Sequence, residues 1–254
     1  MDIGIIIMGF LIGCLVGMTG VGGAALLTPI LILIGVKPTI AVGTDLVYNS
    51  ITKLLGCIQH CRQKTVNYKL VLHLAIGSVP SAIVAIILLN LLDSVYVNQE
   101  QIIKHSLGYV LIVVAFVTLF NVFFYSKERA NSLKNKSMSE KKSLAIVIGV
   151  ILGFIVGLTS IGSGSLFAIA MMFLYRLKMV ELVGTDIAHA FVLVTVAGAL
   201  NAGLGNVDYG LVVNLLLGSL PGVFIGSKMA IKVPDKFLRV LVSFIILISG
   251  IKII

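Results

Sequence analysis

Charged residues are scarce in this chain. Asp, Glu, Lys and Arg make up 11% of its 254 residues, whereas 59% are hydrophobic, and the mean hydropathy is +1.14. A soluble domain of this length could not cover so much apolar side chain with polar surface. Several apolar runs exceed the roughly 20 residues that a helix needs to span a bilayer. The composition therefore excludes an ordinary soluble domain and predicts a polytopic membrane protein.

Other features are also missing. The three cysteines, Cys14, Cys57 and Cys61, lie in or beside apolar runs, which favours packing over disulfides. Cys57, His60 and Cys61 lack a fourth ligand, so we expect no metal site. No basic region precedes the first apolar run, so we expect no cleavable signal peptide. Neither His-Glu-x-x-His nor Gly-x-Ser-x-Gly occurs, so we expect no enzyme and no cofactor.

The chain instead contains an internal repeat. Gly13-Cys-Leu-Val-Gly17-Met-Thr19-Gly-Val-Gly22 returns 140 positions later as Gly153-Phe-Ile-Val-Gly157-Leu-Thr159-Ser-Ile-Gly162. Further matches follow at an offset of 141: 42–45 with 183–186, 66–68 with 207–209, and 77–80 with 218–221. Duplicated halves with glycine-interrupted apolar runs are typical of secondary transporters, whose binding site lies between the halves near the bilayer midplane.

The halves are a repeat over 1–125 and a repeat over 144–254, joined by a basic linker over 126–143. Eight apolar runs are visible, over 3–35, 40–60, 70–92, 102–125, 144–175, 182–204, 210–231 and 237–254. The first run of each half is too long for one comfortable span and is broken by a Thr/Gly cluster. Each of these runs is either one long tilted helix or a hairpin of two short helices.

Loop charge separates the two arrangements, because Lys and Arg collect in cytoplasmic loops. Single long helices make the repeats parallel and divide the loop Lys and Arg 10 against 8. Hairpins make the repeats inverted and place 15 in the cytoplasm against 3 outside. We therefore predict an all-α polytopic membrane protein of two inverted-topology repeats. Each repeat has a glycine-interrupted re-entrant hairpin of short helices followed by three transmembrane helices, with both termini outside and the linker inside.

The glycine-rich tips are candidate anion sites. A helix that restarts after such a break offers unpaired N–H groups and a positive dipole end, and hydroxyls can add donors. The alternative is close helix packing through small residues, which we expect for the runs 9–17, 149–157 and 218–226 with their Gly-x3-Gly-x3-Gly spacing. The candidate substrate-binding residues of the tips are Thr19, Gly20, Gly22, Gly23, Thr159, Ser160, Gly162 and Ser163.

Ionisable residues mark the second segment of each half. Asp45, Asn49 and Lys53 are spaced by four, so they share one helical face. A charge inside a membrane segment is a functional hypothesis by default. Lys53 is a candidate counter-charge for an anion, and Thr44, Asn49 and Thr185 are further substrate-binding candidates.

The candidate groups for binding and releasing a coupling proton are Asp45, Asp186 and His189. The alternative for the two acids is that Thr44/Asp45 and Thr185/Asp186 cap helix N-termini. His60 and Arg62 are expected at a cytoplasmic mouth that attracts anions. Asn201, which matches His60 in the repeat, would be polar lining on the opposite side.

These motifs resemble the sulfite exporter TauE/SafE family over essentially the whole chain. The resemblance rests on Gly17–Gly23, Pro29, Ala41–Thr44, His60-x-Arg62 and Val66–Tyr68, and in the second half on Gly157–Gly164, Val183–Thr185, Asn206–Tyr209 and Gly218–Gly226. It implies a permease of the bacterial plasma membrane, without a prosthetic group, that moves sulfite, sulfoacetate or other sulfonates, usually outward. Asp45 and Asp186 depart from the family pattern, which has a small hydroxyl residue after Gly-Thr.

Our interpretation is an alternating-access carrier for a small sulfur-containing anion, with coupling to protons. A carrier for another small anion such as a carboxylate, an anion channel and a membrane-embedded enzyme are the rival hypotheses. The partners expected are the substrate and the lipid bilayer, with a homodimer left open. Nucleic acid is not expected, because the net charge of +9 sits in loops that orient the chain.

Overall fold

The computed structural model describes residues 2–19, 23–93, 99–124, 141–175, 177–230 and 235–254. Within them the chain is all-helical, with no strand. The first half forms α1 (Ile3–Thr19), α2 (Ala24–Leu33), α3 (Pro38–Arg62), α4 (Tyr68–Asp93) and α5 (Gln99–Phe124). The second half forms α6 (Lys142–Thr159), α7 (Ser165–Leu174), α8 (Met179–Gly203), α9 (Tyr209–Ala230) and α10 (Asp235–Ile253). The prediction of an all-α polytopic membrane protein is confirmed, and the long first run of each half is divided into two helices.

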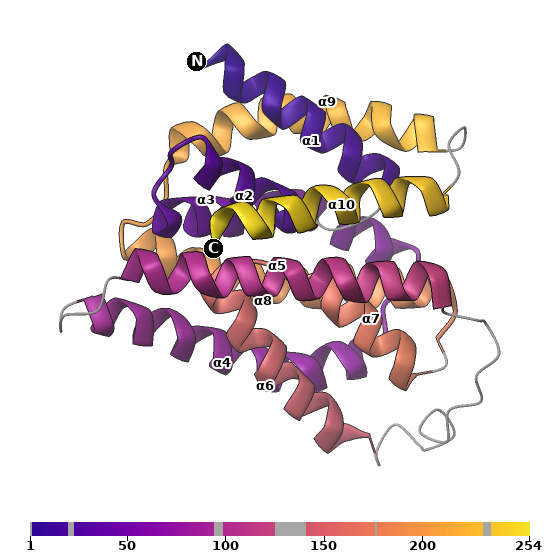
Figure 1. Cartoon of the computed structure of the whole chain (residues 1–254). Helices are drawn as coiled ribbons and strands as arrows, with labels where there is room; N and C mark the ends of the chain where they lie inside the picture. Colours follow the sequence, from indigo (N-terminus) through magenta and orange to yellow (C-terminus); the bar gives the residue numbers. More distant parts are fainter. Residues whose placement is uncertain (1, 20–22, 94–98, 125–140, 176, 231–234) are drawn as a thin grey trace.

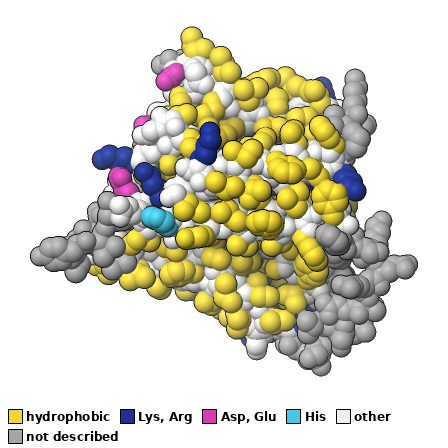
Figure 2. Space-filling view, viewed as in Figure 1, with side chains coloured by type: hydrophobic (Ala, Val, Ile, Leu, Met, Phe, Trp, Pro, Cys, Tyr) yellow, Lys and Arg dark blue, Asp and Glu magenta, His cyan; other side chains and the backbone are white. Residues whose placement is uncertain are grey.

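The helices suit a membrane. Five described helical segments are long and apolar enough to cross one: Tyr68–Leu91, Glu100–Phe120, Lys142–Thr159, Met179–Gly203 and Tyr209–Met229. Large apolar side chains are exposed along most helices, among them Leu72, Phe116 and Phe224. Hydrophobic side chains cover the middle of the face shown in Figure 2, while most charged side chains lie toward its edges. An apolar belt of this kind is stable against lipid, because hydrocarbon solvates it as well as a protein core does.

The two halves exchange contacts in a reciprocal way. α1 packs on α9 and α6 packs on α4, so the first helix of each half crosses the fourth helix of the other half (Figure 1). α3 packs on α8 and α5 packs on α10, so these helices contact their own counterparts. The core of the molecule is therefore shared between the halves and belongs to neither of them alone.

Glycines make the α1–α9 and α4–α6 contacts possible. A Cβ atom on Gly13 would lie 2.5 Å from the backbone oxygen of Ser219, and one on Gly153 would overlap the backbone of Ser78. Gly222, on the partner helix of α1, faces the backbone of Phe10 in the same way. The expectation that these glycine runs pack helices is confirmed, because only a residue without a side chain lets two backbones approach so closely.

The central pair, α3 and α8, is antiparallel. Thr44, near the start of α3, lies beside Asp208 after the end of α8, and Thr185, near the start of α8, lies beside Asn67 after the end of α3. Near the middle of both helices, the hydroxyls of Ser50 and Thr195 are 2.7 Å apart. Parallel repeats would bring matching helices together running in the same direction. The antiparallel course is the one that inverted repeats require.

Candidate functional site

One buried carboxyl group joins three separate parts of the chain. Asp45 Oδ2 accepts hydrogen bonds from Thr28 Oγ1 on α2 (2.9 Å) and from Ser160 Oγ in the α6–α7 connection (2.6 Å). Its Oδ1 accepts one from Asn49 Nδ2, one turn along α3 (2.7 Å). All four residues are buried. We call this group the Asp45 cluster, and its bonds connect α2 of the first half to the α6–α7 connection of the second half through α3.

The alternative that Asp45 and Asp186 cap helix N-termini is wrong. α3 begins at Pro38, with Lys37 in the N-cap position, so Asp45 lies about two turns inside the helix. α8 begins at Met179 after an N-cap at Lys178, which places Asp186 equally far inside. The apolar runs suggested later helix starts because the first turns of both helices carry polar residues. Neither carboxyl group therefore caps the N-terminus of its helix.

The threonines before the two acids have another role. Thr44 Oγ1 accepts the backbone N–H of Asp208 (3.1 Å), and Thr185 Oγ1 accepts the backbone N–H of Asn67 (3.0 Å). Asp208 and Asn67 directly precede the first turns of α9 and α4, whose N–H groups have no partner within their own helices. Both hydroxyls are thus engaged in joining the halves.

Lys53 lies at the centre of the α3–α8 pair. Its spacing from Asp45 and Asn49 places it on the same face of α3, as predicted. Its Nζ donates to the backbone oxygen of Ser163 beyond the α6 break (3.3 Å) and is half-buried. The ammonium group interacts electrostatically with Asp45 and also with Asp186. Other Lys and Arg residues of the described helices lie nearer to helix ends, so Lys53 is the positive charge available to the middle of the molecule.

The break between α6 and α7 is a turn with left-handed backbone. Ser160 has φ 62° and Gly162 has φ 101°, and a residue with a side chain is strained at such angles. The turn aims the Ser160 hydroxyl at Asp45 and the Ser163 carbonyl at Lys53. Thr159 Oγ1 donates to the Ile155 carbonyl and accepts from the N–H of Ile161, so it serves the end of α6.

The matching break in the first half falls mainly on residues that the structure does not describe. Gly20, Gly22 and the side chain of Thr19 lie outside the described residues. Gly23, directly before α2, faces Tyr48 and Asn49 on α3. The contribution of this tip to a substrate site stays a prediction.

Asp186 and His189 form a second buried polar group on α8, without the bonding of the Asp45 cluster. His189 Nε2 lies 2.9 Å from Ser78 Oγ on α4, and its ring packs on Phe167 of α7 with 4.3 Å between ring centroids. His189 Nδ1 and Asp186 Oδ1 are buried and have no hydrogen-bond partner among the described residues. Asp186 and His189 are close in sequence but are not hydrogen-bonded to each other.

At the end of α3, the side chains of His60 and Arg62 lie in different environments. His60 Nδ1 is 2.8 Å from Thr65 Oγ1, and this pair packs against Gly184 at the start of α8. Arg62 is exposed. Cys57 and Cys61 lie nearby with 3.9 Å between their sulfur atoms. No group of metal-ligating side chains occurs among the described residues.

Two residues that the sequence pattern did not single out belong to the site. Thr28 is a polar residue in an otherwise apolar run, and its match in the second half is Ala168, so the repeat gives no signal for it. Ser78, the partner of His189, has Ser219 as its match. Because a serine occurs at this position in both halves, the repeat itself could have indicated Ser78 as a candidate site residue.

The sequence profile of the sulfite exporter TauE/SafE family matches residues 5–253. The chain belongs to the TauE/SafE family. It is 58% identical over 254 residues, the full length of both proteins, to probable membrane transporter protein YjnA of Bacillus subtilis (strain 168). Over 263 residues, covering 97% of this chain and 92% of the relative, it is 28% identical to probable membrane transporter protein MJ0441 of Methanocaldococcus jannaschii. No solved structure matches significantly. As a TauE/SafE protein with these relatives, the chain is a multi-pass membrane transporter.

Proposed function

We propose that this TauE/SafE protein is a bacterial plasma-membrane carrier that exports small sulfur-containing anions, such as sulfite, sulfoacetate or other organosulfonates, by alternating access. The family name supports the substrate class. The observation that carries the proposal is the central placement of Lys53, between the two halves and beside the α6–α7 break. The surroundings screen a positive charge in that position poorly, and it attracts an anion most strongly when the neighbouring Asp45 and Asp186 carboxyl groups are protonated.

The other predicted features fit the same proposal. The cytoplasm would hold the linker and the His60/Arg62 mouth, and both termini would lie outside. The antiparallel course of α3 and α8 supports this inverted arrangement of the repeats 1–125 and 144–254. The glycine tips would supply N–H donors to the substrate's oxygens. No residue of the site is assigned a catalytic role.

The decisive experiment is counterflow in proteoliposomes. Purified protein is reconstituted into vesicles loaded with unlabelled sulfite or sulfoacetate, and entry of the labelled anion is followed. We expect trans-stimulation by the sulfur anions and none by acetate or phosphate. Stimulation by acetate alone would favour a carboxylate carrier. Flux that neither saturates nor responds to the internal load would favour a channel.

Coupling to protons is part of the proposal, and the Asp45 cluster supports it. Asp45 Oδ2, Thr28 Oγ1 and Ser160 Oγ lie pairwise at 2.9, 2.6 and 2.7 Å. Three oxygens at these distances need three protons to make a hydrogen bond along each edge. When Asp45 is ionised, both hydroxyls donate to its Oδ2, and neither has a proton left for the edge between them. When Asp45 is protonated, its O–H can donate to one hydroxyl, which then donates to the other, so that all three edges are bonded. The same triangle loses one bond when Asp45 ionises.

Replacement of Asp45 by asparagine tests this role. Asp45→Asn keeps a polar side chain of the same shape but cannot release a proton. We expect the variant to fold and to retain counterflow, whereas uptake driven by a pH gradient falls to the rate measured without a gradient. Asp208→Asn, at an exposed carboxyl group, is the matched control and should respond to the gradient as the wild type does. Undiminished gradient-driven uptake by Asp45→Asn would exclude Asp45 as the coupling group.

A further inference from the structure

The two loops that follow the central helices α3 and α8 have the same backbone. In each loop three successive N–H groups donate to carbonyls four, three and five residues earlier, those of 63–65 after α3 and those of 204–206 after α8. This is the pattern of a Schellman motif, in which the residue just past the helix end has left-handed backbone. That residue is Lys64 in the first loop, with φ 56°, and Gly205 in the second, with φ 77°.

Lysine is an unfavourable residue at this position. Glycine is usual there, because it has no Cβ atom to clash in the left-handed region. Gly205 follows that rule, whereas Lys64 keeps a long charged side chain at the same point of the motif. The Lys64 side chain is exposed and forms no hydrogen bond or ion pair with another described residue. Contacts within the described part of the protein do not offset the strain, which directs attention to a partner outside the chain.

Two more basic residues lie close to Lys64 in the chain. Arg62 and Lys69 are also exposed, without an ion pair to another described residue, and we call the three side chains the basic patch. Their matches in the second half are all glycine: Gly203, Gly205 and Gly210. From α8, Glu181 accepts a hydrogen bond from Asn67 of this loop (3.2 Å) and sets one negative charge against the three positive ones. The patch therefore keeps an excess of positive charge.

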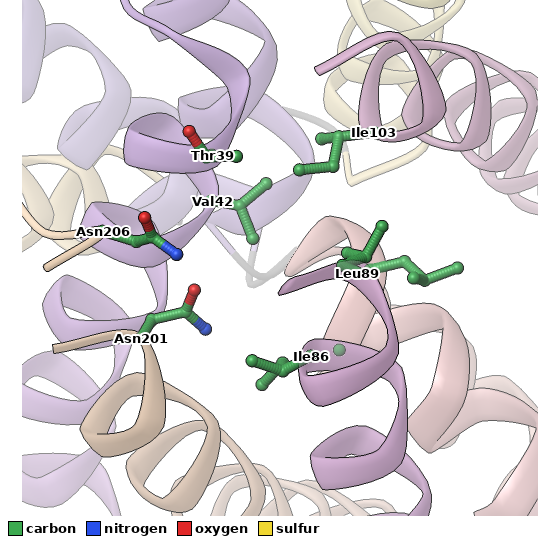
Figure 3. A pocket seen from close by; sticks show the side chains of 9 residues that line it. Thr39, Val42, Ile86, Leu89, Ile103, Asn201 and Asn206 are labelled. Carbon is green, nitrogen blue, oxygen red and sulfur yellow. The ribbon is translucent and has the colours of Figure 1, made fainter. Parts of the chain in front are cut away.

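The matching loop at the other end of the molecule has uncharged side chains that face inward. Figure 3 shows Asn206 of that loop and Asn201 on one side of a small apolar pocket, with Ile86 and Leu89 on the other. Its cavity volume is about 10 Å³, which has room for about one water molecule. The same backbone thus supports an uncharged loop at one end and three exposed positive charges at the other.

The basic patch lies at the edge of the lipid-facing surface. Tyr68, which lies between Lys64 and Lys69 in the chain, begins an apolar stripe on α4 that continues with Leu72 and Ile76. These three side chains are 63%, 59% and 48% exposed, and their spacing by four places them on one helical face. A tyrosine at the end of such a stripe is typical of the headgroup region of a bilayer. The two lysines are therefore placed at about the depth of the lipid phosphates.

We propose that the basic patch binds the phosphate headgroup of an anionic phospholipid in the adjacent leaflet. Lys and Arg side chains near a membrane surface are attracted to such lipids. Orientation of the chain by positive loops needs charge only somewhere in the loop, so it does not account for a lysine at the one strained position. A bound phosphate does, because it fixes where the ammonium group must lie. The inference concerns the lipid-facing surface and is independent of which anion the protein carries.

Thermal unfolding in detergent tests the lipid site, because a ligand that binds only the folded protein raises its unfolding temperature. Delipidated protein is titrated with dilauroyl phosphatidylglycerol, with the zwitterionic dilauroyl phosphatidylcholine, and with glycerol phosphate, which has the headgroup charge without the acyl chains. We expect a saturable rise with phosphatidylglycerol alone. Lys64→Gln/Lys69→Gln should weaken the apparent affinity about 25-fold, from about fivefold for each positive charge removed.

Two further variants make the result specific. Lys37→Gln/Lys104→Gln removes the same charge from exposed lysines at the opposite end, where Ile103 lines the small pocket, and should bind phosphatidylglycerol like the wild type. Lys64→Gly relieves the left-handed strain, so it should raise the unfolding temperature in lipid-free detergent. The same variant should bind phosphatidylglycerol about fivefold more weakly, because one charge is lost. A lysine kept only for packing or solubility would not give this opposite pair of effects.

Three results would each overturn the inference. Equal stabilisation by phosphatidylcholine would show that the acyl chains alone bind. Stabilisation by glycerol phosphate as large as that by phosphatidylglycerol would assign the patch to a soluble anion. Wild-type affinity for phosphatidylglycerol in folded Lys64→Gln/Lys69→Gln would exclude the two lysines as the binding groups. None of these measurements involves transport, so each leaves the proposed function untouched.

Discussion

Replacing Lys53 by alanine is expected to reduce anion counterflow about 10- to 100-fold at subsaturating substrate, the usual loss when a charged hydrogen-bond donor is removed from a desolvated site. Lys53 is the basic residue at the centre of the α3–α8 pair, and no other Lys or Arg of the described helices lies there to replace it. Lys53→Arg keeps the positive charge and should retain part of the activity. The measurement is the initial rate of labelled sulfite entry at several concentrations.

Two comparisons make the Lys53 result interpretable. Lys37→Ala removes an exposed lysine at the start of the same helix and should transport like the wild type. Monodisperse elution and a cooperative unfolding transition show that Lys53→Ala is folded, although loss of the attraction between Lys53 and the buried Asp45 and Asp186 should lower the unfolding temperature. Wild-type kinetics in folded Lys53→Ala would exclude Lys53 as the counter-charge of the substrate.

Gly153→Leu is expected to prevent the accumulation of folded protein. The Cβ atom of any residue at position 153 overlaps the backbone of Ser78 on α4, and a backbone cannot rotate away as a side chain can. Gly153→Ala, the smallest such change, should lower the free energy of unfolding by about 3 kcal/mol, at the upper end of the usual overpacking penalty. Thermal unfolding in detergent measures this change.

Gly203→Ala is the control for Gly153→Ala. A Cβ atom at Gly203 in the last turn of α8 would meet nothing within 4 Å. The same chemical change there should leave stability unchanged or raise it by up to about 1 kcal/mol, because alanine favours a helix over glycine. If both alanine variants unfold at the wild-type temperature, α4 and α6 do not pack as closely as the structure shows.

The two predictions concern different properties of the same arrangement. Small residues at regular spacing let α1 approach α9 and α6 approach α4, and these crossings bring residues of one half into the centre of the other. Lys53 then meets the Ser163 carbonyl, and Asp45 meets the Ser160 hydroxyl, across more than 100 residues of sequence. Close packing of the helices is therefore a condition for assembling the site.

The repeat is approximate in its chemistry. The match of Thr28 is Ala168 and the match of Asn49 is Ala190, so the second half cannot form a copy of the Asp45 cluster. Asp186 instead has a buried Oδ1 without a hydrogen-bond partner among the described residues. We expect the two carboxyl groups to have different roles for this reason. Asp45 is hydrogen-bonded to Thr28 and Ser160, whereas Asp186 lacks such bonds and shares only the electrostatic interaction with Lys53.

The sequence by itself determined the membrane class, the two repeats, the divided first runs and the helix-packing glycines. The membrane class, the helix-packing glycines and the shared face of Asp45, Asn49 and Lys53 follow from local composition or spacing, whereas the repeats and the divided runs follow from matches and loop charges compared along the whole chain. The tertiary structure alone decided that the two acids lie inside their helices, that Thr28 and Ser160 meet at Asp45, and that Asn201 and Asn206 face an apolar pocket. The Ser160–Asp45 contact and the placement of Asn201 and Asn206 opposite Val42 and Ile86 depend on how the two halves dock, and residues more than 100 positions apart carry no local signal of their contact.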